Sequence, residues 1–297
     1  MTSGWNGTWS IYQDVEFGHY YARLSGQTLI RLNGLLLYVA RKPLLGFTTA
    51  YLYSPEAAAV PQAVTPRRLN AFLCSRRIAR MVVHTNTALA SFRHHPSSGG
   101  TFVIDLKRSE EELFRGMEGR CRTAVRKGEK AGLRAEKVVD EPDLRDWYSM
   151  YSTTADERSF GRLPYSQVKG LWESSWGMLF GAFKEEKLVA GAFLLLGPYP
   201  VYLLGAMHPK YRNLSPTNSL QWEIIRWAKG EGYTCYDLGG ARDDPNHGPT
   251  RFKASLGGTF HRSFSYLVKG PSLRYGMLRA AESLSQRTFA PLLGRTR

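Results

Sequence analysis

The chain has 297 residues, of which 43% are hydrophobic and 22% are charged. This length suits one large globular domain or two of moderate size, and the composition excludes a collagenous or disordered chain. Lys and Arg number 40 against 25 Asp and Glu, which gives a net charge of +15. Such an excess predicts an anionic partner, either a nucleic acid, a nucleotide or a lipid headgroup.

The three cysteines predict a reducing compartment. Cys74, Cys121 and Cys235 are far apart and form no C-x-x-C pair, so we expect neither a disulfide framework nor a zinc knuckle, and we expect the chain in the cytoplasm. The first ten residues are polar and do not resemble a signal peptide. Since every apolar run is shorter than the roughly 20 residues of a membrane helix, we expect no stable membrane insertion.

Short β-rich runs fill the first third of the chain. Asn33-Gly34 separates two of these runs, which is typical of a β-hairpin. Pro66 follows Thr65 and predicts the first turn of a helix that ends near Arg77. The strands expected in this part are residues 20–24, 28–32, 35–40, 47–53, 79–84 and 101–106.

A capping box opens the middle of the chain. Ser109 with Glu112 three residues later predicts a helix start, and Gly132 predicts its end, so we expect one helix over residues 110–130. A strand over 133–139 and a helix from Glu141 to about residue 155 follow.

The second half repeats this order of elements. We expect helices at 165–174, 217–230 and 250–255, strands at 178–184, 188–196, 200–207, 234–238 and 260–268, and a C-terminal helix after Gly270-Pro271. Both halves therefore contain antiparallel strands, then a helix, then another strand. This order predicts an α+β fold of two similar domains that meet near residue 140.

The helix over residues 110–130 carries a basic face. Arg122, Arg126 and Lys130 are spaced four apart, and Lys127 adds a further charge. Because like charges at this spacing destabilise a helix, the face is expected either to meet phosphates or to be simply solvated.

The segment from Tyr202 into the helix at 217–230 reads as strand, loop, helix. GNAT-type N-acyltransferases use this arrangement to hold the pyrophosphate of acyl-CoA with backbone N–H groups. Here Asn213, Ser215 and Pro216 stand where small glycines are expected, and proline has no N–H to donate. The scaffold therefore fits the GNAT type, whereas the loop does not.

Gly239-Gly240 follows a short strand and allows a ligand to approach the backbone closely. Arg251 and Lys253 come shortly after this pair. The same residues also fit an ordinary turn followed by two exposed basic side chains.

Two arginines flank an aromatic residue in the loop before residue 165. Arg158 and Arg162, with Phe160 between them, could grip a phosphate or carboxylate and stack on a ring. Either arginine could instead form an ion pair with Asp156 or Glu157.

Several catalytic motifs are missing from the sequence. It contains no nucleophile elbow, no zinc-protease motif, no phosphate-binding P-loop and no dinucleotide fingerprint. The seven histidines show no metal-ligand spacing, so no metal site is expected.

Taken in order, these segments resemble the Fem family of aminoacyl-tRNA-dependent peptidyltransferases, which consist of two GNAT-like domains. Residues 122–132 (RTAVRKGEKAG) are similar to the family's basic segment, and Thr154 to Tyr165 to its arginine-rich region. The helix with Asn218 and Trp222, the strand YDLGG at 236–240 and the segment FKASLG at 252–257 match further family motifs. The family's Gly-Pro turn in the first domain is replaced by residues 53–56 (YSPE).

The resemblance implies a domain organisation and a set of site residues. One GNAT-like domain would comprise residues 1–140 with 271–297 packed back on it, and the other residues 141–270. Lys253 would stabilise the reaction intermediate. The acceptor would be bound by Arg158, Arg162, Tyr165, Tyr202, Gly239 and Gly240, and the tRNA by Arg122, Arg126, Lys127, Lys130 and Arg251.

The resemblance also implies the reaction. An amine attacks the ester that links an amino acid to the tRNA 3′ end, and no cofactor or metal is needed because the ester is already activated. The acceptor would be the free amine of a uridine-linked peptide, either a peptidoglycan precursor or a uridyl-peptide antibiotic of the pacidamycin type, and the enzyme a monomer. An acyl-CoA-dependent GNAT enzyme and a non-catalytic RNA-binding protein remain as alternatives.

Overall fold

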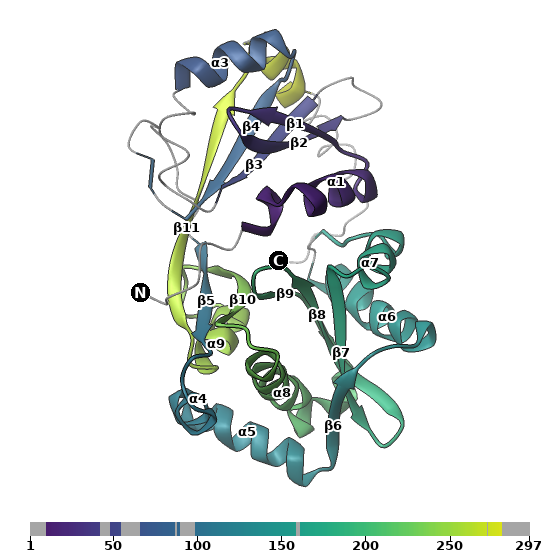
Figure 1. Cartoon of the computed structure of the whole chain (residues 1–297). Helices are drawn as coiled ribbons and strands as arrows, with labels where there is room; N and C mark the ends of the chain where they lie inside the picture. The colour runs from purple at the N-terminus through teal and green to yellow at the C-terminus, as the bar shows by residue number, and fades with distance from the viewer. Residues whose placement is uncertain are drawn as a thin grey trace. The chain divides into compact units, whose positions relative to one another are not determined.

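The computed structural model describes residues 10–41, 48–54, 66–86, 88–89, 99–158, 161–271 and 273–280. The chain divides into two compact units, one within Ser98–Arg262 and the other within Trp9–Ser97 and Ser263–Arg297 (Figure 1). This division corrects the boundary predicted near residue 140. Residues 99–137 contribute strands that pair with the second half of the chain, so they belong to its unit.

The unit within Ser98–Arg262 is built on a mixed sheet in the order β5-β10-β9-β8-β7-β6, and the start of β11 lies beside β5. Neighbouring strands are antiparallel except β9 and β10, which are parallel and register Val201 with Asp237. The strands are β5 (Gly99–Asp105), β6 (Leu133–Lys137), β7 (Gly177–Lys184), β8 (Lys187–Leu196), β9 (Pro200–Met207), β10 (Cys235–Arg242) and β11 (Thr259–Lys269).

Helices cover both faces of this sheet. Trp147 packs against Gly191 on one face, where an added Cβ would lie 2.3 Å from the indole. The alternate residues Ala190 and Ala192 face the opposite core, which also contains Ile224. The helices are α4 (Glu110–Gly116), α5 (Gly119–Lys130), α6 (Glu141–Glu157), α7 (Tyr165–Trp172), α8 (Pro216–Gly230) and α9 (Gly248–Ser255), with a 3-10 helix, η2 (Pro209–Leu214).

The single helix predicted over residues 110–130 is wrong. The capping box at Ser109 and Glu112 is present, but the chain becomes extended at Met117 and Glu118 and separates α4 from α5. The Glu118 N–H donates to the Ser255 carbonyl, and the Arg122 guanidinium donates to the carbonyls of Arg115 and Met117. These tertiary bonds replace the helical ones that the sequence pattern favoured.

The second unit contains strands β1 to β4 and the later part of β11, in the order β1-β2-β3-β4-β11. The predicted hairpin is confirmed, with Asn33 and Gly34 at its turn. Residues 273–280 are helical and belong to this unit, whereas 281–297 lie outside the described residues. The remaining elements are η1 (Ser10–Gln13), α1 (Val15–Leu24), α3 (Pro66–Ser75), β1 (Thr28–Leu32), β2 (Leu35–Arg41), β3 (Thr48–Ser54) and β4 (Arg80–Thr85).

One strand prediction in this unit is wrong. Residues 20–24 lie in helix α1, which begins after Asp14. The Asp14 carboxylate accepts the Phe17 N–H and caps the helix, and Phe17, Gly18 and Ala22 form its buried face. This helical spacing outweighs the β propensity of the tyrosines in the segment.

Candidate active site

A bulge in β10 forms the centre of the candidate site. The register between β10 and β5 shifts between Asp237 and Gly240. Gly239 within this bulge has φ +71°, and an added Cβ would lie 2.2 Å from the Tyr202 carbonyl oxygen. Only glycine fits here, because the backbone is left-handed and the neighbouring strand is too close.

A buried carboxylate holds the bulge in place. Asp237 is fully buried, and its Oδ1 accepts the Gly239 N–H at 2.8 Å. The Thr101 hydroxyl on β5 contacts the same Oδ1 and lies 2.9 Å from the Gly239 carbonyl. The peptide groups on both sides of Gly239 are therefore fixed by two side chains.

Lys253 extends from α9 to this bulge. Its Nζ donates to the Gly240 carbonyl at 2.7 Å and lies 5.5 Å from the centre of the Tyr202 ring. Burial lowers the pKa of Lys253 to about 8, against the opposing effect of the Asp237 charge. The amine therefore changes its charge close to neutral pH.

Tyr202 lies flat along its own strand. An added Cβ on Gly205 would overlap the Tyr202 hydroxyl, so the glycine makes room for the phenol. Burial raises the pKa of Tyr202 to about 12, and the hydroxyl therefore stays protonated and can donate a hydrogen bond. Of the predicted site residues, the structure brings Lys253, Tyr202, Gly239 and Gly240 together.

The other predicted acceptor residues lie apart from this group, between α6 and α7. Arg158 ends α6 and is exposed, and Arg162 forms an ion pair with Asp156 at 3.3 Å, which is the alternative that the sequence left open. The Tyr165 hydroxyl donates to Glu141 at 3.2 Å. In the described part of the chain no hydrogen bond, ion pair or ring contact joins these three residues to Lys253. Phe160, predicted to stack, lies outside the described residues.

The predicted tRNA-binding residues of α5 differ in their surroundings. Arg122 is engaged with the carbonyls at the end of α4, and the Arg126 guanidinium lies 5.2 Å from the centre of the Phe114 ring. Lys127 and Lys130 are exposed. Of the four predicted tRNA-binding residues on α5, only these two lysines have charged groups with no hydrogen bond, ion pair or ring contact to another described residue.

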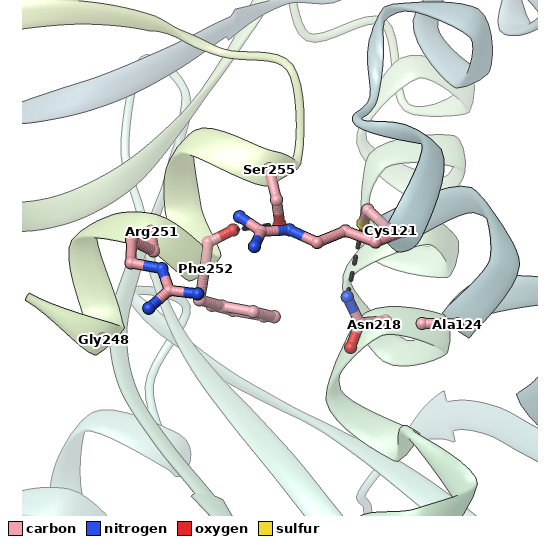
Figure 2. A pocket seen from close by; sticks show the side chains of 8 residues that line it. Cys121, Ala124, Asn218, Gly248, Arg251, Phe252 and Ser255 are labelled. Carbon is pink, nitrogen blue, oxygen red and sulfur yellow. Dashed lines mark hydrogen bonds between the residues drawn. The ribbon is translucent and has the colours of Figure 1, made fainter. Parts of the chain in front are cut away.

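A cavity of about 430 Å³ lies between α5, α8 and α9 (Figure 2). Figure 2 shows the Phe252 ring directed across it toward Asn218, whose amide donates to the Cys121 sulfur at 3.3 Å. A second cavity of about 390 Å³ lies on another side of α9, beside Phe102 and Phe260. Arg120 and Arg251 line both cavities, so two cationic side chains lie where the two cavities meet.

Arg251 and Lys253 point to different sides of α9. They are two residues apart, which places them about 200° apart around the helix axis. Arg251 faces the cavities, whereas Lys253 faces the bulge of β10. The sequence indicated both cations but could not show that they serve separate surfaces.

Sequence reasoning missed two residues of this site, Thr101 and Asp237. They meet although they are 136 residues apart in the chain. An acidic residue inside the apolar strand before Gly239-Gly240 was a signal for Asp237. No local pattern indicated Thr101.

Comparisons with known proteins identify similar sequences and a similar fold. The acetyltransferase (GNAT) domain family matches residues 115–254. A lipid II:glycine glycyltransferase of Staphylococcus epidermidis is 37% identical over 63 residues, which are 21% of this chain and 15% of that protein. A crystal structure of FemX superposes with a TM-score of 0.63 at 16% identity and covers 88% of this chain and 92% of that one. The resemblance to the Fem family is confirmed.

The same fold occurs in a second kind of solved structure. The C-terminal domain of a putative lysylphosphatidylglycerol synthetase from Agrobacterium fabrum superposes with a TM-score of 0.61 at 16% identity, covering 93% of this chain and 94% of that chain. The Fem-like chain thus has an α+β, GNAT-like fold, as predicted. Within its described residues, no helix is long and apolar enough to cross a bilayer.

Proposed function

We propose that this chain is an aminoacyltransferase with aminoacyl-tRNA as donor and the free amine of a peptide as acceptor. The observation that carries the proposal is the placement of Lys253 against the Gly240 carbonyl and the Tyr202 ring, at the bulge of β10. The partial identity with a lipid II:glycine glycyltransferase supports a peptidoglycan precursor as the acceptor. The N-terminal amine of a uridyl-peptide antibiotic of the pacidamycin type is the other acceptor of this class.

In the proposed reaction a cation lies beside the reacting carbonyl. The acceptor amine attacks the ester carbon, a C–N bond forms, and the C–O bond to the ribose breaks. The ribose oxygen leaves with the proton that the amine loses. The Lys253 ammonium would stabilise the negative oxygen of the intermediate, and the Tyr202 hydroxyl could donate a hydrogen bond near it. The ester supplies the driving force, so we propose no cofactor.

The cavities around α9 support an anionic donor. Arg251 lies between them, and exposed Lys127 and Lys130 extend the positive charge along α5. Arg120 lines both cavities but is ion-paired with Glu118 at 2.7 Å, and Asp243 and Asp244 also line the second cavity, so the first cavity is the more cationic of the two. We propose that these cations bind phosphates of the tRNA acceptor end. The reaction would take place in the cytoplasm, on a monomeric enzyme.

An acyl-CoA-dependent enzyme is the alternative that the GNAT match favours. The segment before α8 argues for the tRNA donor. It forms the 3-10 helix η2 and a left-handed Ser215 instead of a glycine loop, and α8 begins with Pro216. Since proline offers no N–H, one of the donors that would hold a pyrophosphate at this helix end is missing.

A transfer assay tests the proposal. The purified protein would receive a pool of radiolabelled aminoacyl-tRNAs with UDP-muramyl pentapeptide, lipid II or a uridyl tetrapeptide as acceptor, and phosphatidylglycerol as a lipid control. We expect RNase-sensitive transfer of label to one of the peptide acceptors. Label on phosphatidylglycerol alone would contradict the peptide acceptor, and consumption of acetyl-CoA in place of aminoacyl-tRNA would contradict the donor.

A further inference from the structure

Asp237 is an unusual residue for the interior of a sheet. It is fully buried on β10, the strand that lies between β5 and β9. A buried carboxylate costs several kcal/mol unless hydrogen bonds and opposite charges compensate it. Two contacts of this carboxylate lead toward the candidate site.

Two hydrogen bonds connect the carboxylate to the bulge. Oδ1 accepts the Gly239 N–H at 2.8 Å, and the Thr101 hydroxyl lies within hydrogen-bond distance of both this oxygen and the Gly239 carbonyl, so that its single proton can be donated to either acceptor. The next carbonyl along the chain, that of Gly240, accepts the Lys253 ammonium at 2.7 Å. The place of that ammonium therefore depends on the conformation that Asp237 and Thr101 impose.

Asp237 also acts on Lys253 through its charge. Burial favours the neutral amine, and the carboxylate favours the charged form. Among the described residues, the titratable groups that interact with this pair include the Tyr202 phenol on β9 and His261 on β11, whose pKa is lowered by burial and raised by Asp237. On β10 itself, burial raises the pKa of Cys235 and Tyr236, so that both stay neutral. Asp237 is thus the negative charge that opposes the loss of the Lys253 proton.

We propose that Asp237 is the positioning residue of this site: with Thr101 it fixes the Gly239–Gly240 bulge, whose Gly240 carbonyl holds the Lys253 ammonium beside the Tyr202 ring. The catalytic consequence rests on the proposed aminoacyl transfer. The effect of Asp237 on the protonation of Lys253 does not depend on that proposal, because it can be measured in the protein without substrate.

Asp237→Asn removes the negative charge of this side chain while nearly keeping its size and shape. The asparagine oxygen can still accept the Gly239 N–H and the Thr101 hydroxyl, but the negative charge is gone. Without it the pKa of Lys253 falls below that of the unaltered protein, so more of the amine is neutral at neutral pH. We expect Lys253 to react severalfold faster with acetic anhydride at neutral pH, and the midpoint of its labelling curve to move to lower pH.

Competitive labelling followed by peptide mass spectrometry measures this without any substrate. Asp105→Asn, on the same strand as Thr101 but at its other end, is the matched control and should leave the curve unchanged. An Asp237→Asn curve that coincides with that of the unaltered protein would overturn the charge role. If no acceptor is ever aminoacylated, this labelling still tests the effect of Asp237 on Lys253. The proposed aminoacyl transfer and the proposed role of Asp237 can therefore fail separately.

Thr101→Val tests the geometric role and covers the case in which Asp237→Asn does not fold. Removing the hydroxyl frees the Gly239 carbonyl, and a displaced ammonium should lower kcat about ten- to a hundredfold while KM changes little. Thr101→Ser keeps the hydroxyl and should restore the rate. An unchanged kcat in Thr101→Val, or a Thr101→Ser variant as slow as Thr101→Val, would overturn the role of Thr101 in fixing the bulge.

Discussion

At the scale of single residues, the charge of Lys253 governs the proposed chemistry. Its pKa of about 8 lies well below the ordinary lysine value because burial disfavours the ammonium. The charged form is fully present below this pKa and is lost as the pH rises through it. A rate that needs the ammonium must therefore fall above about pH 8.

Lys253→Ala should lower single-turnover transfer at least about a hundredfold, a loss typical of removing one group that stabilises the oxyanion. Lys253→Arg should keep part of the rate and show no decline above pH 8, since arginine stays charged. Rates measured against pH for the three proteins check this. If the decline persists in Lys253→Arg, another group causes it.

The two adjacent glycines of the bulge offer a matched pair of variants. Gly239→Ala must place a Cβ 2.2 Å from the Tyr202 carbonyl at φ +71°, so we expect a loss of about 2 kcal/mol or more in the free energy of unfolding. An added Cβ on Gly240 meets nothing within 4 Å, so Gly240→Ala should unfold close to the unaltered protein. Urea denaturation compares them. Equal stability of both variants would mean that the bulge is not tightly fixed.

At the scale of secondary-structure elements, α5 combines two roles that its sequence does not separate. The spacing of Arg122, Arg126 and Lys130 predicted one basic face. The structure shows instead that Arg122 holds the end of α4, whereas Lys130 is exposed together with Lys127.

Arg122→Ala should therefore reduce the free energy of unfolding by about 1–3 kcal/mol, because it leaves the Arg115 and Met117 carbonyls without this donor. Lys127→Gln with Lys130→Gln should change the free energy of unfolding by less than about 1 kcal/mol, weaken tRNA binding and make its salt dependence less steep. Thermal unfolding and filter binding at several salt concentrations distinguish the two. The account fails if the lysine variant binds tRNA as the unaltered chain does.

Much of the element order could be predicted from local signals. The Asn33-Gly34 hairpin and the Ser109 capping box are present because their chemistry acts over a few residues. The helix over 110–130 was wrong because its break depends on Ser255, far along the chain. For the same reason Lys253 and Gly239 could be named from sequence, whereas the pairing of Thr101 with Asp237 could not.

At the scale of the whole molecule, the boundary between the two compact units does not lie near residue 140. One unit contains Ser98–Arg262, and the other contains Trp9–Ser97 and Ser263–Arg297. The core of the unit within Ser98–Arg262 joins Ile104, Leu106 and Val125 to Ile224 and Leu238. These side chains come from both sides of the predicted boundary.

A fragment of residues 141–270 should therefore be insoluble or unfolded, since it lacks β5, α5 and β6 and would expose the apolar face of α8. A fragment of residues 98–262 should give more soluble, helical protein. Expression of both with circular dichroism tests this. A folded 141–270 fragment would restore the boundary near residue 140.

The central claim is that the donor is aminoacyl-tRNA. The measurement that tests it most directly compares kcat/KM for aminoacyl-tRNA and for acetyl-CoA with the same peptide acceptor, with mass spectrometry of the product. We predict that the acceptor gains one aminoacyl residue for each tRNA ester consumed, and that Lys253→Ala slows this gain at least about a hundredfold. An acceptor that gains an acetyl group and no amino acid would contradict the account.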